Sequence, residues 1–238
     1  MKLYAYCLTE GLNSLASSPR GINDAAVYVA EVNDFSLLVS DFAGDNLPVS
    51  RDNVLAHAAV VGSVLDRTTP LPFRFGTIAT QPQLESYLGA RHESLASRLK
   101  LVRGCVEMGV KIIWDREWTE ASPDEKSAER PGTHFLEDKR RAILGGEARV
   151  EAAKSVAAWL AGALCDLVRD TRLAINPTDK LLVAAAHLVR RDSIDEYRAR
   201  LKQARLERAE LYFLASGPWP PYSFANIDLE FKTQFGVS

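Results

Sequence analysis

The pattern of apolar and polar residues in the first part of the chain predicts three β-strands. Apolar residues dominate at 3–8, 26–32 and 35–40, and a loop rich in Gly, Ser, Pro and Asn separates the first two segments. Asn33 and Asp34 join the last two segments as a two-residue connection of the kind found in β-hairpins. The chain is therefore expected to begin with one strand followed by a hairpin.

Two helices are predicted next. The first begins at Ser50 or Asp52, either of which can cap a helix N-terminus, and continues to about residue 66. Apolar residues at helical spacing predict one buried face, made of Val54, Leu55, Ala58, Val61 and Leu65. The second helix is predicted at 83–102, with an inward face made of Leu84, Tyr87, Leu88, Leu95, Leu99 and Val102.

Between these helices, a short strand is predicted at 73–77. Side chains alternate across a strand, which places Phe73 and Phe75 on one face and Arg74 on the other. Arg74 would then either pair with a nearby carboxylate or anchor an interface.

The second half of the chain alternates between strand and helix patterns. Strands are predicted at 105–114, 173–175, 181–189 and 210–215, with a long helix at 133–169. The residues expected to face inward are Val150, Ala153, Ala157, Leu160, Leu164 and Leu167 of this helix and Ile194, Tyr197, Leu201 and Ala204 of a further helix. Two mid-helix glycines cost about 2 kcal/mol relative to alanines, so a kink or break is expected at Gly145-Gly146. Ser193 and Glu196 match a capping box that opens a further helix. The order is β-α-β-β-α-β, as in a ferredoxin-like sandwich.

Together these elements predict an α+β protein of two domains. A chain of 238 residues is long enough for two domains of roughly 100 residues each. The first domain is expected at 1–103. The second, a modified ferredoxin-like (βαββαβ) sandwich with the long helix, is expected at 104–216. Residues 217–238 are expected to form a C-terminal tail rich in proline and aromatic residues that packs on the fold.

The tail begins with Gly-Pro-Trp-Pro-Pro-Tyr-Ser-Phe at 217–224. Its three prolines fix φ and remove three backbone donors, which excludes a helix or a central strand and favours an extended, polyproline-like ribbon. Because such a ribbon is stiff before it packs, docking its rings costs little chain entropy. We expect it to close the end of the fold. The alternative is a ligand for an aromatic-lined groove of a partner.

Composition and charge are those of an ordinary globular protein, with 47% hydrophobic residues, 25% charged residues and a net charge of −2. A net charge this close to zero does not attract nucleic acid or an anionic membrane. No transmembrane helix is predicted, and the first residues become polar too quickly for a signal peptide. Cys7, Cys105 and Cys165 are widely spaced, which predicts three reduced, buried thiols in a cytosolic protein.

The chain contains no motif for catalysis, metal binding or phosphate binding. Its four histidines, His57, His92, His134 and His187, share no metal-ligand spacing. The sequence also lacks G-x-x-x-x-G-K-[ST], G-x-G-x-x-G and G-x-S-x-G. The residues alone therefore give no support for an enzyme activity, a cofactor, a metal or a small-molecule substrate.

Two classes of function, a nucleic-acid- or ligand-binding module and an enzyme, stay open from the residues alone. Arg198, Lys202 and Arg205 form a basic stripe on the last predicted helix, so the ferredoxin-like half could be an RNA- or ligand-binding module. The aromatic signature of RNA-recognition modules is missing, however, and a solvated face is the expectation. A deep polar pocket with titratable groups would instead indicate an enzyme.

Three segments carry a family resemblance: Leu-Pro-Phe-Arg-Phe-Gly-Thr at 71–77, Pro-Gly-Thr-His-Phe-Leu-Glu-Asp-Lys-Arg at 131–140, and the segment at 217–224. The opening Leu-Tyr-Ala-Tyr at 3–6 and the strand pattern at 107–114 fit as well. In this order, across nearly the whole chain, they resemble the gas vesicle protein GvpF/GvpL family. The motif positions, which either contact a partner or hold the fold, are Phe73, Arg74, Gly76, Thr77, Trp219, Pro220, Tyr222 and Phe224.

The resemblance implies two α+β domains, the second a modified ferredoxin-like fold, and a non-enzymatic role. Members of the family are minor components or assembly factors of gas vesicles, the hollow protein shells that give prokaryotes buoyancy. The implied partners are the small hydrophobic shell protein and other gas vesicle accessory proteins, with no nucleic acid or membrane. The implied location is the cytoplasm, in association with the gas vesicle. No catalytic residues carry over.

Overall fold

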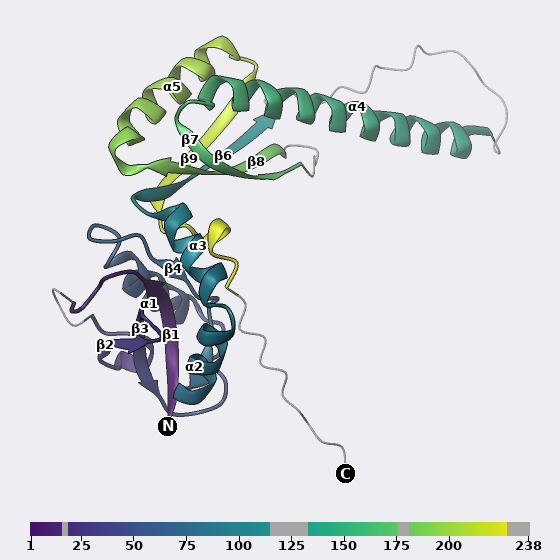
Figure 1. The fold of residues 1–238 in the computed structure, drawn as a ribbon. Helices are drawn as coiled ribbons and strands as arrows, with labels where there is room; N and C mark the ends of the chain where they lie inside the picture. Colours follow the sequence, from purple (N-terminus) through teal and green to yellow (C-terminus); the bar gives the residue numbers. More distant parts are fainter. Residues whose placement is uncertain (16–18, 115–132, 176–180, 228–238) are drawn as a thin grey trace. The chain divides into compact units, whose positions relative to one another are not determined.

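The computed structural model describes residues 1–15, 19–114, 133–175 and 181–227, with secondary structure but not side chains for 114 and 133–145. Contacts divide the chain into two compact units (Figure 1). Unit 1 is Met1–Glu107 together with the segment that begins at Pro218, and unit 2 is Met108–Gly217.

Unit 1 is built on a five-stranded sheet. Its strands are β1 (Lys2–Thr9), β2 (Val27–Val32), β3 (Phe35–Phe42), β4 (Leu71–Pro72) and β5 (Ile78–Thr80). The order is β2-β3-β1-β4, β5 also pairs with β1, and the pairs are antiparallel. The first three strands confirm the prediction. Asn33 and Asp34 have φ of 48° and 68°, the left-handed conformation that a two-residue hairpin turn requires.

The first helix, α1 (Arg51–Gly62), begins as predicted but buries only part of the predicted face, including Val61. At its start the Ser50 hydroxyl accepts a hydrogen bond from an amide of the first turn. Its buried residues are His57, Val60 and Val61. In contrast, Val54, Leu55 and Ala58, which were predicted to face inward, are exposed. Both faces of α1 carry apolar residues at helical spacing, so the pattern alone could not distinguish them.

The helix predicted at 83–102 is two helices, α2 (Gln81–Ala90) and α3 (His92–Val102). Arg91 between them has φ −120° and ψ 14°, which is not helical. Gly89, just before it, lowers the helix propensity by about 1 kcal/mol relative to alanine. Most of the predicted inward positions are nevertheless buried, namely Leu84, Leu88, Leu95, Leu99 and Val102, whereas Tyr87 is half-buried.

The chain between β4 and β5 is a turn and not the predicted strand. Gly76 has φ +82°, which strand geometry does not allow, and the Thr77 amide donates to the Arg74 carbonyl at 3.2 Å. The side chains nevertheless lie on the predicted sides, since Phe75 packs against the buried cluster of β1 and α1. Phe73 is fully buried and Arg74 is exposed.

Unit 2 combines a four-stranded sheet with two helices, in the predicted element order. The elements are β6 (Cys105–Trp114), α4 (Thr133–Leu164), β7 (Val168–Ala174), β8 (Leu181–Arg190), α5 (Ile194–Glu207) and β9 (Leu211–Trp219). The strand order is β7-β8-β6-β9, and β7 pairs with β8 in antiparallel orientation. The helices α4 and α5 contact each other and β8 (Figure 1).

The core of unit 2 lies between these helices and the sheet. Its buried helix residues include Ala153, Ala157, Leu160 and Leu164 of α4 and Tyr197, Leu201 and Ala204 of α5, all of which were predicted to face inward. The buried ring of His187 on β8 lies 2.7 Å from the Tyr197 hydroxyl on α5. Sheet and helix are thus joined by one polar contact within an apolar core.

The bounds of two elements in unit 2 differ from the prediction. The helix α4 runs through Gly145-Gly146 without a break and ends at Leu164 (Figure 1). The strand predicted at 173–175 is the longer β7, which pairs with β8 along most of its length. Pairing with a neighbouring strand therefore extends β7 into residues that the sequence pattern assigned to the helix.

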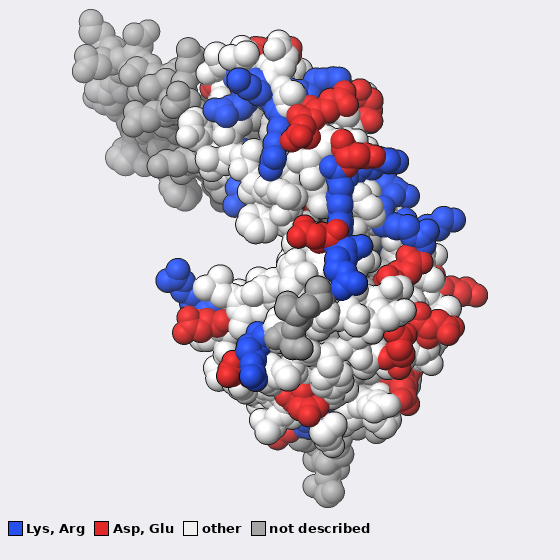
Figure 2. All heavy atoms as spheres, turned by 90° about the vertical axis from the view of Figure 1, so that its left-hand side faces the viewer, with Lys and Arg blue, Asp and Glu red and all other residues white. Residues whose placement is uncertain are grey.

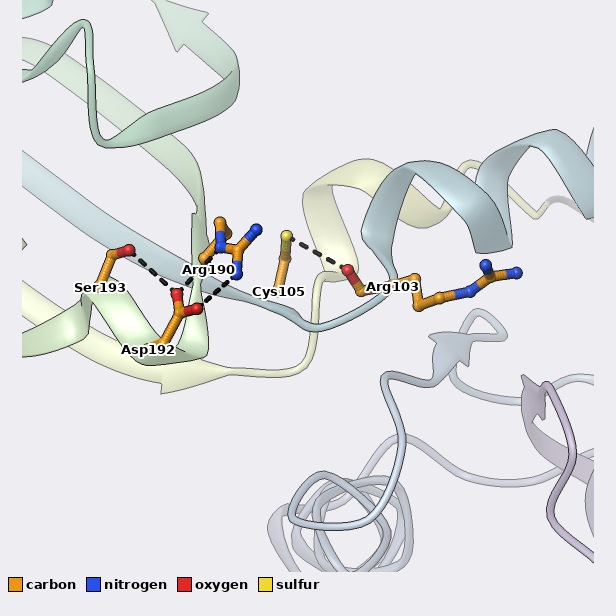
Figure 3. Close-up of polar contacts among 5 residues, drawn as sticks. All are labelled: Arg103, Cys105, Arg190, Asp192 and Ser193. Carbon is orange, nitrogen blue, oxygen red and sulfur yellow. Dashed lines mark hydrogen bonds and ion pairs between the residues drawn. The ribbon is translucent and has the colours of Figure 1, made fainter.

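Ser193 precedes α5, but its hydroxyl makes no capping hydrogen bond. It donates instead to Asp192 at 3.0 Å, and Asp192 also accepts two hydrogen bonds from the Arg190 guanidinium (Figure 3). These hydrogen bonds lower the pKa of Asp192 to about 2. The neighbouring carboxylate thus competes for the hydroxyl, and the predicted capping box does not form.

Two of the three cysteines are buried, as predicted, but Cys165 is exposed. Cys165 follows the last residue of α4, where Leu164 takes the buried position. In unit 1, the Cys105 thiol donates to the Arg103 carbonyl at 3.6 Å (Figure 3).

The segment at 217–224 is extended only in its first part. The strand β9 continues to Trp219 at an edge of its sheet, which proline tolerates. After Pro220 and Pro221, the chain forms a short helix, α6 (Tyr222–Ala225). The prediction of an extended ribbon is therefore wrong for α6.

Candidate functional site

Two of the family motifs, about 145 positions apart in the sequence, come together in unit 1. The helix α6 of the C-terminal motif packs against β4, which begins the motif at 71–77, and against α3. Since these segments lie far apart in the sequence, only the tertiary structure brings them together. We call the surface that they form the motif surface; it consists of residues 71–77 and 219–225.

The turn that follows β4 is held by hydrogen bonds to β1. The Phe73 amide donates to the Tyr6 carbonyl at 2.9 Å, and the Gly76 amide donates to the Tyr4 hydroxyl at 3.0 Å. Within the turn, the Thr77 hydroxyl donates to the Arg74 carbonyl at 2.6 Å. The two sides of the turn are therefore fixed on Tyr6 and Tyr4 of one strand, and Arg74 is exposed.

A buried cluster of aromatic rings lies beneath this turn. The Tyr4 hydroxyl lies 2.9 Å from Nδ1 of His57, and the two tyrosine rings, Tyr4 and Tyr6, are 4.8 Å apart. Phe75 from the turn packs edge-on against His57. Burial lowers the pKa of His57 to about 4 and raises the pKa of Tyr4, so both groups are neutral at pH 7.

This neutral cluster is a structural core rather than a catalytic one. A general base must reach the proton that it removes, but only 3% of His57 is exposed. The Cys7 thiol of β1 is fully buried as well, and burial raises its pKa. Neither group is placed or ionised for nucleophilic chemistry.

The C-terminal motif is anchored by Glu107. Its two carboxylate oxygens accept hydrogen bonds from the Ser223 amide at 2.8 Å and the Ser223 hydroxyl at 2.7 Å. Pro220 and Phe224 are buried next to this contact, whereas Trp219 is 54% exposed and Tyr222 is 42% exposed. Burial, together with the neighbouring Cys7 and Glu107, raises the pKa of Tyr222 to about 12.

The predicted motif positions thus fall into a buried group and an exposed group. Phe73, Thr77, Pro220 and Phe224 are buried, and Gly76 supplies the left-handed turn. Arg74, Trp219 and Tyr222 are exposed.

Tyr4, His57 and Glu107 were not predicted from the sequence as site residues. Tyr4 belongs to the Leu-Tyr-Ala-Tyr segment that carried part of the resemblance. Glu107 interrupts an apolar strand pattern, and that interruption was the available signal. His57 gave no signal, because its partner is far away in the sequence.

A separate groove of about 480 Å³ lies on the first sheet. Its lining is mostly apolar, with Leu3, Leu37 and Val39 from the sheet and Leu84 from α2. Over the part of the chain that the structure describes, no group of three or more His, Cys, Asp or Glu side chains could hold a metal ion. No described helix is both long and apolar enough to cross a membrane.

The basic stripe on α5 is partly paired with acidic residues. Within the stripe, Arg198 lies 3.8 Å from Asp195. Arg200, which is on α5 but outside the stripe, lies 3.4 Å from Asp166. Figure 2 shows acidic and basic side chains next to one another in its upper part. This mixture is typical of a solvated face, in agreement with the expectation from the sequence.

Comparison with known proteins places these features in a family. The model of the family described as gas vesicle synthesis protein GvpL/GvpF matches residues 2–226. Gas vesicle protein L1 of Halobacterium salinarum is 27% identical over 93% of this chain and 89% of its own length. Gas vesicle protein F2 of the same organism is 25% identical over 95% of this chain and 93% of its own length.

The fold is also that of solved gas vesicle proteins. The crystal structure of GvpF from an Anabaena species superimposes with a TM-score of 0.80 at 19% identity, over 95% of this chain and 99% of that one. GvpF from Microcystis aeruginosa gives a TM-score of 0.76, also at 19% identity, over 95% of this chain and 99% of that one. With a family match over nearly its whole length, the chain belongs to the GvpL/GvpF family of gas vesicle proteins.

Proposed function

We propose that this protein is a non-enzymatic accessory or minor structural protein of the gas vesicle that assists shell assembly in the cytoplasm. In this role it binds the hydrophobic shell protein and other gas vesicle proteins. The observation that carries the proposal is the meeting of two family motifs in one surface of unit 1. The exposed members of that surface, Arg74, Trp219 and Tyr222, are of the residue types that are enriched at protein interfaces.

The physical reason for such a role lies in the shell protein. A subunit apolar enough to keep liquid water out of a gas space exposes surfaces or strand edges that aggregate before assembly. A protein that covers these surfaces keeps the subunit dispersed and can release it to a growing shell. This requires shape and apolar contact, not bond chemistry.

We further propose that the two units are two domains and that unit 2 is a modified ferredoxin-like sandwich. Its element order, β6-α4-β7-β8-α5-β9, and its strand order, β7-β8-β6-β9, support this assignment. The C-terminal motif then belongs to the first domain, because α6 packs on β4 and α3.

Co-expression of the full chain with the shell protein of the same gas vesicle tests the function. We expect the shell protein to stay soluble and to co-purify with a tagged chain. The double variant Trp219→Ala/Arg74→Ala should reduce this recovery, while Tyr212→Ala, which removes a 52% exposed ring from unit 2, serves as the control. An insoluble shell protein that never co-purifies with the wild-type chain would contradict the proposal.

A further inference from the structure

The two edge strands of the sheet in unit 2 differ in charge. The strand order β7-β8-β6-β9 places β7 at one edge and β9 at the other. The strand β7 carries Arg169, Asp170 and Arg172. In contrast, β9, with the sequence Leu-Tyr-Phe-Leu-Ala-Ser-Gly-Pro-Trp at 211–219, carries no charged residue. Charged residues on an edge strand oppose pairing with a further strand, so β7 is protected in this way and β9 is not.

The outer side of β9 is open from the middle of the strand onward. Phe213 is buried, and its ring packs edge-on against Trp159 of α4 on the face of the sheet that the helices cover. Beyond it the alternation of buried and exposed side chains ends, because Leu214, Ala215 and Ser216 are all exposed. No described strand pairs with this side of β9. An edge strand of this kind presents backbone N–H and C=O groups that its own sheet does not pair.

These features specify a β-strand as the partner. Unpaired backbone groups in a row along an edge are matched by the backbone of another extended segment. The exposed side chains next to them are apolar, with Tyr212 52% exposed and Leu214 45% exposed. Neighbouring strands bury such side chains against each other as cross-strand pairs. The fitting partner is therefore an uncharged strand that carries apolar side chains.

The sequence of β9 is complementary to itself in antiparallel pairing. Three large residues, Leu-Tyr-Phe, precede Leu214, and three small residues, Ala-Ser-Gly, follow it. When a second β9 pairs so that Leu214 lies opposite its own copy, Tyr212 lies opposite Ser216 and Phe213 lies opposite Ala215. Each aromatic ring then covers a small residue on the same face of the sheet, and no two rings compete for one place.

The bounds of the strand fit this register. Gly217 has φ +113° and Pro218 has no N–H to donate, so the regular part of β9 ends there. Pairing centred on Leu214 uses residues 211–217 of each copy and stops before Pro218. A contact that uses the same strand in both copies also closes on itself. The outer edges of the joined sheets are then the two β7 strands, whose charged residues oppose further growth.

We propose that β9 is the site at which a second copy of this chain binds, through antiparallel β9–β9 pairing with Leu214 on the two-fold axis. The inference goes beyond the proposed function and does not depend on it. A dimer of this kind covers the one uncharged edge of the sheet in unit 2. Since each copy contributes a single strand, the dimer is expected to be weak and concentration-dependent.

Disulfide trapping in the full chain tests the register. Cys165 is exposed, so every variant carries Cys165→Ser; the other two cysteines are buried. Leu214→Cys should form a disulfide-linked dimer under mild oxidation, because opposite Cα atoms of antiparallel strands lie about 4.5–5.5 Å apart, within disulfide range. Tyr212→Cys should form at most about a tenth as much, because four residues separate it from its copy, or more than about 13 Å.

Leu173→Cys is the matched control for random collision. Leu173 lies on β7, the other edge strand, and its 48% exposure is close to that of Leu214. We expect this variant to form as little disulfide-linked dimer as Tyr212→Cys.

Sedimentation of the full chain at micromolar to millimolar concentrations measures the reversible dimer. Leu214→Lys places two like charges opposite each other and should weaken dimerisation by at least about tenfold. Leu173→Lys adds the same charge at the β7 edge and should leave dimerisation within about twofold of wild type. Thermal unfolding checks that each variant is folded. If Leu214→Lys fails to fold, the cysteine variants, which add no charge, decide the result.

Each outcome supports or overturns the proposal. Trapping at Leu214→Cys alone, with a dimer that Leu214→Lys weakens, supports it. Equal trapping at positions 212 and 214, or a dimer that a folded Leu214→Lys chain retains, overturns it. A wild-type chain that stays monomeric overturns it as well. If that monomer also loses co-expressed shell protein in Leu214→Lys but not in Leu173→Lys, the edge belongs to a strand of the shell protein.

Discussion

The hydroxyl of Tyr4 on β1 lies 2.9 Å from Nδ1 of His57 on α1, and this contact turns one of the two apolar faces of the helix toward the sheet. The same hydroxyl accepts a hydrogen bond from the Gly76 amide of the family motif. One side chain thus connects the first strand, the first helix and the turn that carries Arg74.

Tyr4→Phe should destabilise unit 1, because the substitution removes the partner of both the His57 ring and the Gly76 amide. Leaving a buried polar group unsatisfied costs about 1–3 kcal/mol, so the free energy of unfolding should fall by about that amount. Urea unfolding of the full chain measures it. A change below about 0.5 kcal/mol would show that water or a rearranged turn satisfies both groups.

Stability should depend on pH through His57 and His187, whose pKa values are lowered by burial to about 4 from an ordinary 6.5. Between these values the unfolded chain binds protons that the folded chain does not, so stability falls as the pH falls below 6.5 and levels off near 4. Each histidine contributes on the order of 3 kcal/mol across this window. Denaturant titrations at pH 7.5, 6 and 5 test the slope, and equal stability at the three values would contradict it.

Glu107→Ala should loosen α6, because both oxygens of this carboxylate hold Ser223. A hydrogen bond to a charged group contributes about 1.5–3 kcal/mol, and local opening of α6 should become easier by a similar amount. Hydrogen exchange at the amides of α6 is the direct measurement, with the β1 amides as the internal reference. Glu107→Gln retains one acceptor oxygen and should have a smaller effect. If α6 exchanges at the wild-type rate in both variants, burial of Phe224 alone holds it.

Gly76→Ala and Gly62→Ala should change stability in opposite directions. Neither position has a heavy atom within 4 Å of the added carbon, so space does not decide the result. Gly76 has φ +82°, which a residue with a side chain adopts at a cost of about 1–3 kcal/mol. Gly62 ends α1 in a helical turn, where alanine should stabilise by up to about 1 kcal/mol. Thermal unfolding of both variants checks the signs, and destabilisation by Gly62→Ala would show that the end of α1 needs glycine.

Local pattern was sufficient for elements whose residues interact with near neighbours in sequence. The strands β1, β2 and β3, the hairpin at Asn33-Asp34 and the buried stripes of α4 and α5 all follow from periodicity or turn chemistry. Two of the predictions that proved wrong also concern local structure. Ser193 donates to Asp192 instead of capping α5, and the helix predicted at 83–102 is interrupted at Arg91.

By itself the sequence determined where most strands and helices form, the lack of any catalytic or metal-binding motif, and the family to which the chain is similar. Only the tertiary structure decided which face of α1 is buried, which motif residues reach the surface, and that the C-terminal motif packs on β4. The reason is physical: periodicity reports that a face is apolar, whereas burial depends on a partner that the chain brings from a distant position. In α1, the buried face is the one whose His57 contacts Tyr4 of β1, whereas Val54, Leu55 and Ala58 on the other apolar face are exposed.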